Sequence, residues 1–441
     1  MPVSSPFLRT IGAGAIVAMA WSGAAAALVA GAQTQGGAVM GGRIVHVTTL
    51  ADDGPGSLRQ VLNSPGPKVI VFDVGGVIRL ASDIKAATAH TTIAGQTAPP
   101  PGVTLTGGSL RLRASDLVVQ HIAVRPGPGA TAKINGNRDA ITIGGGSHKL
   151  QNILVENVSL SWSVDEDADI AGGTRNVTVR NAIVAEALNH AGHPKGRHSM
   201  GMLINKDNQA VAVTGNLFAA DMFRNPVIAR GSSAYIGYNL IADPGENAIH
   251  VYSAAAPTPL QASIVGNIVE AGPDSDTNIT AVWLPDDMAQ KLPDARIYVQ
   301  DNHAGPGALT NTSGFELAGT PPVLPPSGYA PPADTRAFVL AHAGARPAQR
   351  DAIDARIVAA VQTGEERIVD RPPDRLDAGA VNRRAQVPSS PFQPSSIAGV
   401  LRVQAWLCAE HLVLGGPATP ECPLGEAAYR KALDVTLSQR R

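Results

Sequence analysis

Short apolar strands recur through the middle of the chain, and each ends at a similar turn. From about residue 90 to 305, every unit is a β-branched strand, a turn and a second strand. The turns carry Asn at six places, 24, 35, 23, 28 and 35 residues apart: Asn157, Asn181, Asn216, Asn239, Asn267 and Asn302. His121 takes the same place in an earlier unit. Such a period with loop insertions is typical of a solenoid, in which short strands bury their apolar faces by stacking.

Asn suits these turns for two physical reasons. It tolerates the left-handed backbone of a tight turn, and stacked Asn side chains form hydrogen-bonded ladders. The repeat therefore predicts an all-β fold, a right-handed parallel β-helix. An ordinary β-sandwich is the alternative, and it explains the alternation but not the recurring Asn.

The segments on either side of the repeat differ in character. Before it, residues 56–62 form a short amphipathic helix between two apolar strands, which suits an N-terminal cap of an open stack. After it, residues 351–364 carry apolar residues at helical spacing, and residues 401–414 and 425–437 are two further predicted helices. The predicted division is residues 1–32, 38–320, 321–370 and 371–441: a signal peptide, the β-helix, a proline-rich tail packed on it, and a linker with a small, partly helical extension.

The N-terminus has a targeting pattern. Arg9 precedes an apolar run from Ile11 to Ala30, and small residues follow at 30–32. We expect a cleaved signal peptide and a secreted or periplasmic protein; a single membrane anchor is the alternative. A disulfide between Cys408 and Cys422, the only cysteines, is plausible in an exported chain.

Charge is sparse in this 441-residue chain and nearly balanced. The charged fraction is 16% and the net charge is −1, which argues against nucleic acid as a partner. Against that background, Ser161–Ile170 (SWSVDEDADI) holds four carboxylates, at Asp165, Glu166, Asp167 and Asp169. In an extended strand the three aspartates share one face and Glu166 points to the other. Hard oxygen ligands in that arrangement favour Ca²⁺, and a solvated acidic turn is the alternative.

Basic residues gather in a long loop at 186–204. It carries His190, His193, Lys195, Arg197 and His198, whose spacing matches no strong zinc motif. We expect this basic cluster to face an acidic polymer; a plain surface loop is the alternative. Asp139 lies one unit before the acidic stretch, and Arg224 and Arg230 lie about two units after it. Residues one turn apart in a solenoid are close along its axis, so acids and arginines are expected to line one groove.

Several stretches resemble bacterial polysaccharide lyases of the pectate lyase type. They cover roughly residues 41–370 and include GGRIVHVTTLADDGPGSLRQVL, TTIAGQTAPPPGVTL, DAITI, SWSVDED, HPKGRHSMGMLI and RNP. The resemblance implies a right-handed parallel β-helix and Ca²⁺-dependent β-elimination of polygalacturonate or a related uronate polymer. It implies Asp139, Asp165 and Asp169 as Ca²⁺ ligands and Arg224 as the base that removes the C5 proton. Lys195, Arg230 and His198 are the expected substrate-binding residues, and we expect a monomer.

The sequence departs from the family pattern at three places. The second arginine commonly follows Arg-x-Pro at a shorter spacing than Arg230 does. Glu156-Asn157 stand where Asp-His is common, and Thr214-Gly215 stand where His-His is common before the Asn. Two other function classes therefore stay open. One is a non-catalytic carbohydrate-binding protein on the same fold. The other is a glycoside hydrolase, which needs an acid paired with a nucleophile or base, but leaves the Arg224 context unexplained.

Overall fold

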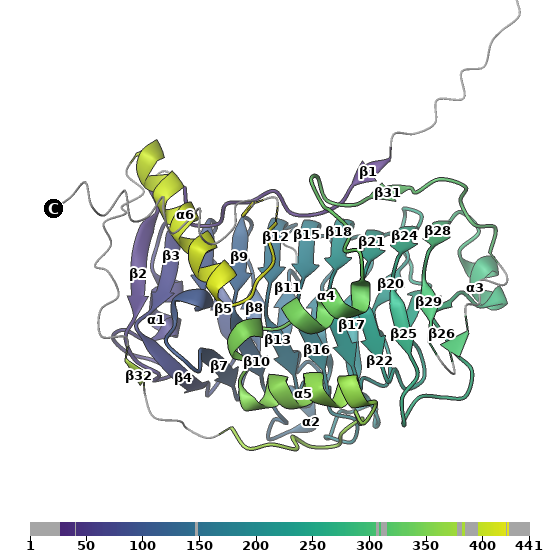
Figure 1. Cartoon of the computed structure of the whole chain (residues 1–441), viewed down its shortest axis with the longest axis horizontal. Coiled ribbons are helices and arrows are strands. Elements are labelled where there is room, and N and C mark those ends of the chain that lie inside the picture. The colour runs from purple at the N-terminus through teal and green to yellow at the C-terminus, as the bar shows by residue number, and fades with distance from the viewer. Residues whose placement is uncertain are drawn as a thin grey trace, which may run out of the picture.

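The structure is a computed structural model. It describes residues 27–39, 41–145, 149–305, 308–309, 315–376, 382–383, 396–419 and 421–422. The predicted signal peptide up to residue 26 and the predicted helix at 425–437 lie outside these residues. Within the described part, three long sheets run side by side along one axis, and each turn of the chain adds one strand to each sheet (Figure 1).

Sheet I has ten parallel strands. They are β2 (Arg43–Val47), β3 (Lys68–Phe72), β6 (Thr91–Ala94), β9 (Leu117–Gln120), β12 (Gln151–Glu156), β15 (Arg175–Arg180), β18 (Gln209–Thr214), β21 (Ser233–Gly237), β24 (Gln261–Val265) and β28 (Arg296–Gln300). Their β-branched residues alternate between the interior and the outer face, as the period of two in a strand requires. Val155 and Val179, for example, are opposite each other in the ladder and fully buried.

Sheet II follows sheet I in each turn. It contains β4 (Val74–Arg79), β7 (Val103–Thr106), β10 (Ile122–Arg125), β13 (Ser159–Ser161), β16 (Ile183–Ala185), β19 (Leu217–Ala219), β22 (Leu240–Ala242), β25 (Ile268–Glu270), β29 (His303–Ala304) and the antiparallel β32 (Asn382–Arg383). Strands β16, β19 and β22 are apolar on both faces, which predicts that something covers the outer one.

Sheet III completes each turn. It contains β5 (Ile84–Ala86), β8 (Leu110–Leu112), β11 (Ile141–Ile143), β14 (Glu166–Ile170), β17 (Met200–Ile204), β20 (Val227–Ala229), β23 (Ile249–Tyr252) and β27 (Val282–Trp283). All of its pairs are parallel, so the chain forms the parallel β-helix that the repeat predicted. Two small pairs, β1 (Leu28–Val29) with β31 (Val323–Leu324) and β26 (Ile279–Thr280) with β30 (Ala308–Leu309), lie beside the three sheets.

The recurring Asn residues perform both predicted tasks, at different turns. Asn157 and Asn181 have positive φ angles of 48° and 52°, and His121 in the preceding turn has 56°. Farther along, Asn216, Asn239, Asn267 and Asn302 form a ladder in which each side-chain NH₂ donates to the next Oδ1, at 2.8–2.9 Å. There the preceding residue takes the positive φ instead, as Gly215 and Tyr238 do.

Helices close one end of the stack and cover two of the three sheets. The short α1 (Leu58–Asn63) buries Leu58 and Leu62 at the N-terminal end, as predicted. The predicted tail helix is α5 (Ala352–Thr363), which lies with α4 (Thr335–His342) on the outer face of sheet II. The longer α6 (Ile397–Val413) places Trp406 against Val69 and Val71 of sheet I. The remaining short helices are α2 (Ala132–Asn135) and α3 (Asp286–Lys291).

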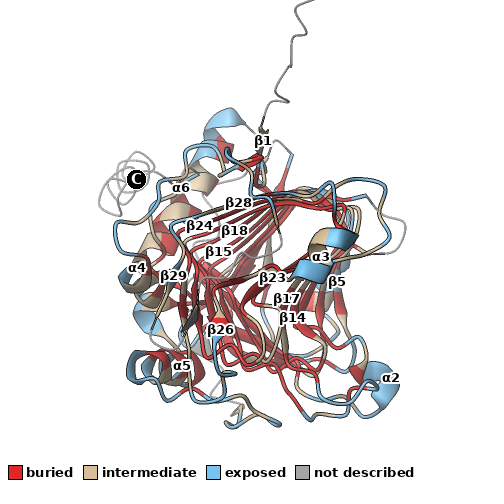
Figure 2. Ribbon diagram, turned by 90° about the vertical axis from the view of Figure 1, so that its right-hand side faces the viewer, coloured by how far each residue is buried: buried red, intermediate tan, exposed pale blue. Residues whose placement is uncertain are grey.

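Charged contacts fix this cover in place. Arg125 of β10 is fully buried and bonds Asp351 and Asp354 of the tail, both at 2.6 Å. Cys408 of α6 and Cys422 form the disulfide that the sequence suggested. In the described part of the chain, α4, α5 and α6 leave the outer face of sheet III uncovered (Figure 2). The site must be sought on that face.

The described N-terminal segment contacts both the solenoid and the tail. Gly31 donates its backbone N–H to Ala210, and β1 pairs with β31 of the tail. Cleavage at residues 30–32 would remove β1 from this pair. No described helix is long and apolar enough to cross a membrane. The signal peptide and the domain limits stay predictions.

A buried histidine pair links α6 to the solenoid and makes a testable pH dependence. His121 is fully buried, bonds His411 at 2.8 Å and the Ala345 carbonyl at 2.7 Å, and burial lowers its pKa from 6.5 to about 3. Between these two pKa values, the imidazole of His121 is protonated in the unfolded chain and neutral in the folded chain. The free energy of unfolding must therefore fall as the pH drops through that window.

We predict that His121→Asn flattens this pH dependence, because Asn occupies the same left-handed turn position in later turns. Urea denaturation from pH 7 to pH 4 measures it, and the exposed His303, changed to Asn, is the control. Equal slopes for wild type and His121→Asn would contradict the assignment.

Candidate active site

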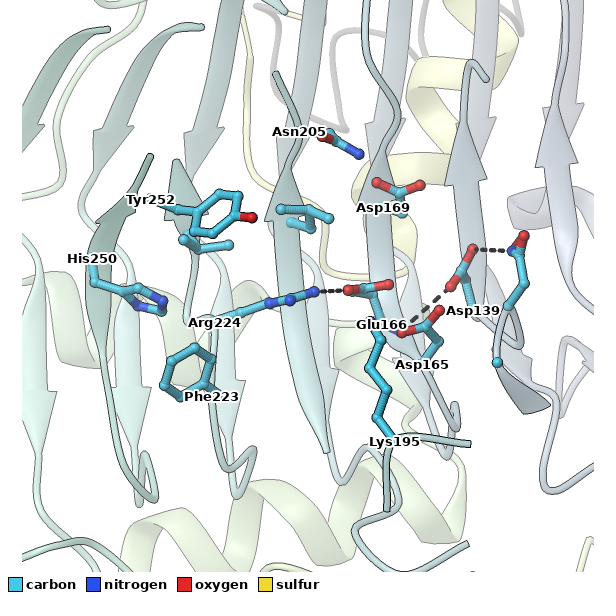
Figure 3. A pocket seen from close by; sticks show the side chains of 14 residues that line it. Asp139, Asp165, Glu166, Asp169, Lys195, Asn205, Phe223, Arg224, His250 and Tyr252 are labelled. Atoms are coloured by element: carbon cyan, nitrogen blue, oxygen red, sulfur yellow. Dashed lines mark hydrogen bonds and ion pairs between the residues drawn. The ribbon is translucent and has the colours of Figure 1, made fainter. Parts of the chain in front are cut away.

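A cavity of about 550 Å³ opens on the outer face of sheet III (Figure 3). It spans successive strands from β11 to β23. Its lining is Gly136, Asn137, Asp139, Asp165, Glu166, Asp169, Lys195, Leu203, Asn205, Phe223, Arg224, Val227, His250 and Tyr252. The solenoid therefore brings residues from the acidic stretch, the basic loop and the RNP motif to one place.

Carboxylates fill one end of the cavity. Oxygen atoms of Asp139, Asp165 and Glu166 lie within 4.8 Å of one another. Asp139 is held by Thr142, which donates to its Oδ2 at 2.6 Å. Asp169 of β14 lines the same cavity, and its Oδ1 is buried without a hydrogen-bond donor in the described part of the chain.

The electrostatics at the carboxylate end of the cavity favour a bound cation. Burial, together with the Asp165 charge, raises the pKa of Asp139 to about 6, against the opposing effect of the Thr142 hydroxyl. Burial also raises the pKa of Asp169 well above its usual value, with the charges of Asp139 and Asp165 as the next causes. Close carboxylates repel unless a positive charge compensates, and an all-oxygen set suits a hard divalent cation.

The predicted alternation of the acidic stretch is wrong. Glu166 faces the cavity beside Asp165 and Asp169, whereas Asp167 is fully buried behind them. The physical reason is local. The Ser163 N–H donates to Asp167 Oδ1 at 3.2 Å, which holds this side chain away from the cavity although it belongs to the same strand as Glu166 and Asp169.

Arg224 extends into the cavity from the turn before β20. Its φ of 64° is left-handed, and its side chain is 23% exposed. The guanidinium contacts the Glu166 carboxylate directly (Figure 3). Burial lowers the pKa of Arg224, while the charge of Asp165 opposes that shift. Arg224 and the acid cluster are therefore in direct contact within the cavity.

The basic loop contributes residues in two ways. Lys195 lines the cavity, as expected for a substrate-binding residue. His198 is 4% exposed and bonds Asp165 Oδ1 at 2.7 Å, while His193 stacks on His198 with ring centroids 3.7 Å apart. Both rings therefore lie behind Asp165, and neither lines the cavity.

These histidines are poorly arranged for zinc, although their nitrogens and an Asp165 oxygen lie within 4.8 Å. The Lys195 backbone N–H donates to His193 Nδ1 at 3.2 Å, which leaves the proton of neutral His193 on Nε2, toward Asp165. Parallel rings also cannot both direct a lone pair at one ion. We read both residues as supports that orient the carboxylate.

Other predicted residues lie away from the cavity. Arg230 bonds Asp294 at 2.9 Å and is absent from the lining, so its substrate-binding role stays a prediction. His190 pairs with Asp370, and Arg197 contacts Glu246.

The departures from the family pattern also lie elsewhere. Glu156 is buried against Arg180 at 2.7 Å, at the end of sheet I. Asn157 donates to the tail carbonyls of His342 and Gly344. Thr214-Gly215 end β18 in the same row of turns. The departures therefore concern the packing of the tail rather than the cavity.

Glu166, His250 and Tyr252 are among the cavity residues that the sequence does not predict. Alternation places Glu166 on the opposite face of the strand. His250 and Tyr252 lie on β23, a full turn beyond Arg224, where no motif points to them. The Tyr252 ring is 53% exposed, and His250 packs edge-on against Phe223 with centroids 4.6 Å apart. No sequence motif marks His250 and Tyr252. The register of the parallel strands places them on this face.

Comparison with known proteins now places this site in a class. No family model matches the sequence. "Probable pectate lyase C" of Aspergillus fumigatus is 31% identical over 382 residues, covering 82% of both chains. The Aspergillus flavus protein of the same name is 31% identical over 353 residues, covering 76% of this chain and 78% of its own.

Solved structures of similar shape include Jun a 1, the major allergen from cedar pollen. It is 17% identical with a TM-score of 0.47, over 64% of this chain and 82% of its own. A pectate lyase of Bacillus sp. N165, in complex with trigalacturonate, is 14% identical with a TM-score of 0.44, over 70% of this chain and 95% of its own. The sequence relatives carry the assignment.

By its similarity to these sequence relatives, the chain is a polysaccharide lyase, and its open face of sheet III carries carboxylates, a lysine and an arginine. On the sequence identity and coverage above, the chain belongs to the pectate lyase family.

Proposed function

We propose that this chain cleaves pectate or a closely related uronate polymer by Ca²⁺-assisted β-elimination in the cavity on sheet III. The observation that carries the proposal is the meeting of Arg224 with the acid group of Asp139, Asp165 and Glu166 in one open groove. The names of the sequence relatives support pectate as the substrate class.

The residues present fit a Ca²⁺ ion. Asp139, Asp165 and Glu166 offer converging oxygens, and Asp169 adds a buried oxygen without a donor among the described residues. Glu166 thus joins the three ligands expected from the sequence. When bound, Ca²⁺ would neutralise the uronate carboxylate and the extra charge that develops on it as the C5 proton leaves.

The chain's own groups supply the remaining steps. Arg224 takes the C5 proton, and its burial favours the neutral guanidine that such a base requires. Lys195 offers its ammonium to a substrate carboxylate. As the C5–H bond breaks, its electron pair forms the C4–C5 double bond and the C4–O bond breaks, so the leaving oxygen takes a proton from water. The exposed Tyr252 ring offers a flat apolar surface for a sugar.

We also propose export of the mature chain, since an acidic plant-type polymer lies outside cells. Arg9 and the apolar run from Ile11 to Ala30 support a signal peptide. The mass of the chain recovered from the medium or periplasm gives the cleavage point directly, and a chain retained whole in the membrane fraction would contradict export.

We predict that the purified chain converts polygalacturonate into an unsaturated product, seen as growing ultraviolet absorbance, and that a chelator abolishes the signal. Added Ca²⁺ restores it. New reducing ends without absorbance would instead identify a glycoside hydrolase, and binding without either product would identify a carbohydrate-binding protein.

Arg224→Ala is expected to lower kcat by about 10²–10⁴-fold, the usual contribution of a positioned base, with a smaller effect on KM. Arg296→Ala, an exposed arginine on sheet I, is the matched control and should leave kcat unchanged. An active Arg224→Ala enzyme would overturn the assignment of the base.

Arg230→Ala tests the remaining prediction, because a raised KM would indicate that Arg230 contacts the substrate.

A further inference from the structure

A second set of oxygen atoms lies inside the solenoid, behind the acid cluster of the cavity. Asp167 and Asp221 are both 0% exposed, and Asn225 is 1% exposed. Each has a side-chain oxygen without a hydrogen-bond donor in the described part of the chain: Asp167 Oδ2, Asp221 Oδ2 and Asn225 Oδ1. Unpaired buried polar atoms are rare in folded proteins and call for a partner.

Hydrogen bonds at the other end of each group fix where these oxygens point. The Ser163 N–H donates to Asp167 Oδ1 at 3.2 Å, and the Ala187 N–H donates to Asp221 Oδ1 at 2.8 Å. Asn225 Nδ2 donates to the carbonyls of Asp221 and Asn247 at 3.1 and 2.9 Å. The amide orientation of Asn225 is therefore settled, because its reverse would place Oδ1 against two carbonyls.

Gly201 makes the oxygens converge. The register of β14 and β17 pairs Glu166 with Met200 and Ala168 with Met202, so Asp167 lies beside Gly201. A Cβ on Gly201 would stand 2.7 Å from Asn225 Oδ1 and 3.1 Å from Asp221 Oδ2. Two of the three oxygens thus lie against the same backbone position, and Asp167 flanks it from the neighbouring strand, close enough for its charge to raise the pKa of Asp221.

Charge identifies the kind of partner. In the described part of the chain, no Lys, Arg or His forms an ion pair with Asp167 or Asp221. The nearby Glu186 also raises the pKa of both groups, but its own charge is paired with Arg356 at 2.6 Å. Buried carboxylates without a positive partner are costly, so either protons or a cation must balance them. Three hard oxygens with no nitrogen or sulfur suit a small hard cation rather than zinc.

We propose that Asp167, Asp221 and Asn225 form a buried site for a small hard cation such as Ca²⁺, separate from the metal group in the cavity. The site ties β14 to the Asp221–Asn225 segment, in which Arg224 lies. Its role is to hold that segment against the solenoid, independently of substrate.

The experiment counts ions in the full chain. Asp165→Asn removes a carboxylate of the cavity group and leaves the buried oxygens intact. After exhaustive dialysis of Ca²⁺-loaded protein against metal-free buffer, elemental analysis of Asp165→Asn should still find about one Ca²⁺ per chain. The double variant Asp165→Asn/Asp221→Asn should retain none. Equal Ca²⁺ content in the two proteins, or none in Asp165→Asn, would overturn the proposal.

Two further variants separate a cation from shared protons. Asn225→Asp adds a charge at constant shape; with a bound cation it should show a larger Ca²⁺-dependent rise in Tm than wild type. If protons balance the carboxyls, Asn225→Asp destabilises the chain equally with and without Ca²⁺, and the proposal fails. Gly201→Ala, which places a methyl group among the oxygens, should lose the Ca²⁺-dependent rise; an unchanged rise would contradict the location.

Discussion

Stacking of one chain turn on the next is the constraint on which the rest of this molecule depends. Each strand is three to six residues long through most of the stack and is stable only through the ladder above and below it. The corners carry buried backbone groups that need partners. The Asn216–Asn302 ladder supplies them, and left-handed residues such as Asn181 let the chain turn without a clash.

The same stacking decides where chemistry is possible. The tail helices and α6 cover sheets I and II, and the buried Arg125–Asp354 contact fixes part of that cover. Sheet III keeps an open outer face, and successive turns place side chains there in rows. Residues from positions 139 to 252 therefore meet in one groove, although they come from several successive turns of the chain.

The carboxylates on both sides of β14 need charge balance. On the outside, Arg224 offsets Glu166, and the remaining carboxylates form a group suited to a cation. On the inside, Asp167 and Asp221 meet no basic side chain of the described residues, and the proposed second ion would balance them. A stretch with four carboxylates in five residues is tolerated because the fold divides them between two environments.

The sequence alone determined the fold class, the cap helix and the tail helix α5, because periodicity and helix spacing are local properties. Through motifs it also pointed to Arg224, Lys195 and the aspartates that line the cavity. Tertiary structure decided that Glu166 faces the cavity and that Asp167 is buried, since contacts such as that of the Ser163 N–H with Asp167 do not follow from a period of two. It also decided that His198 supports Asp165, and that Tyr252 reaches the groove. Those contacts join residues tens of positions apart, and only the register of stacked turns sets their distance.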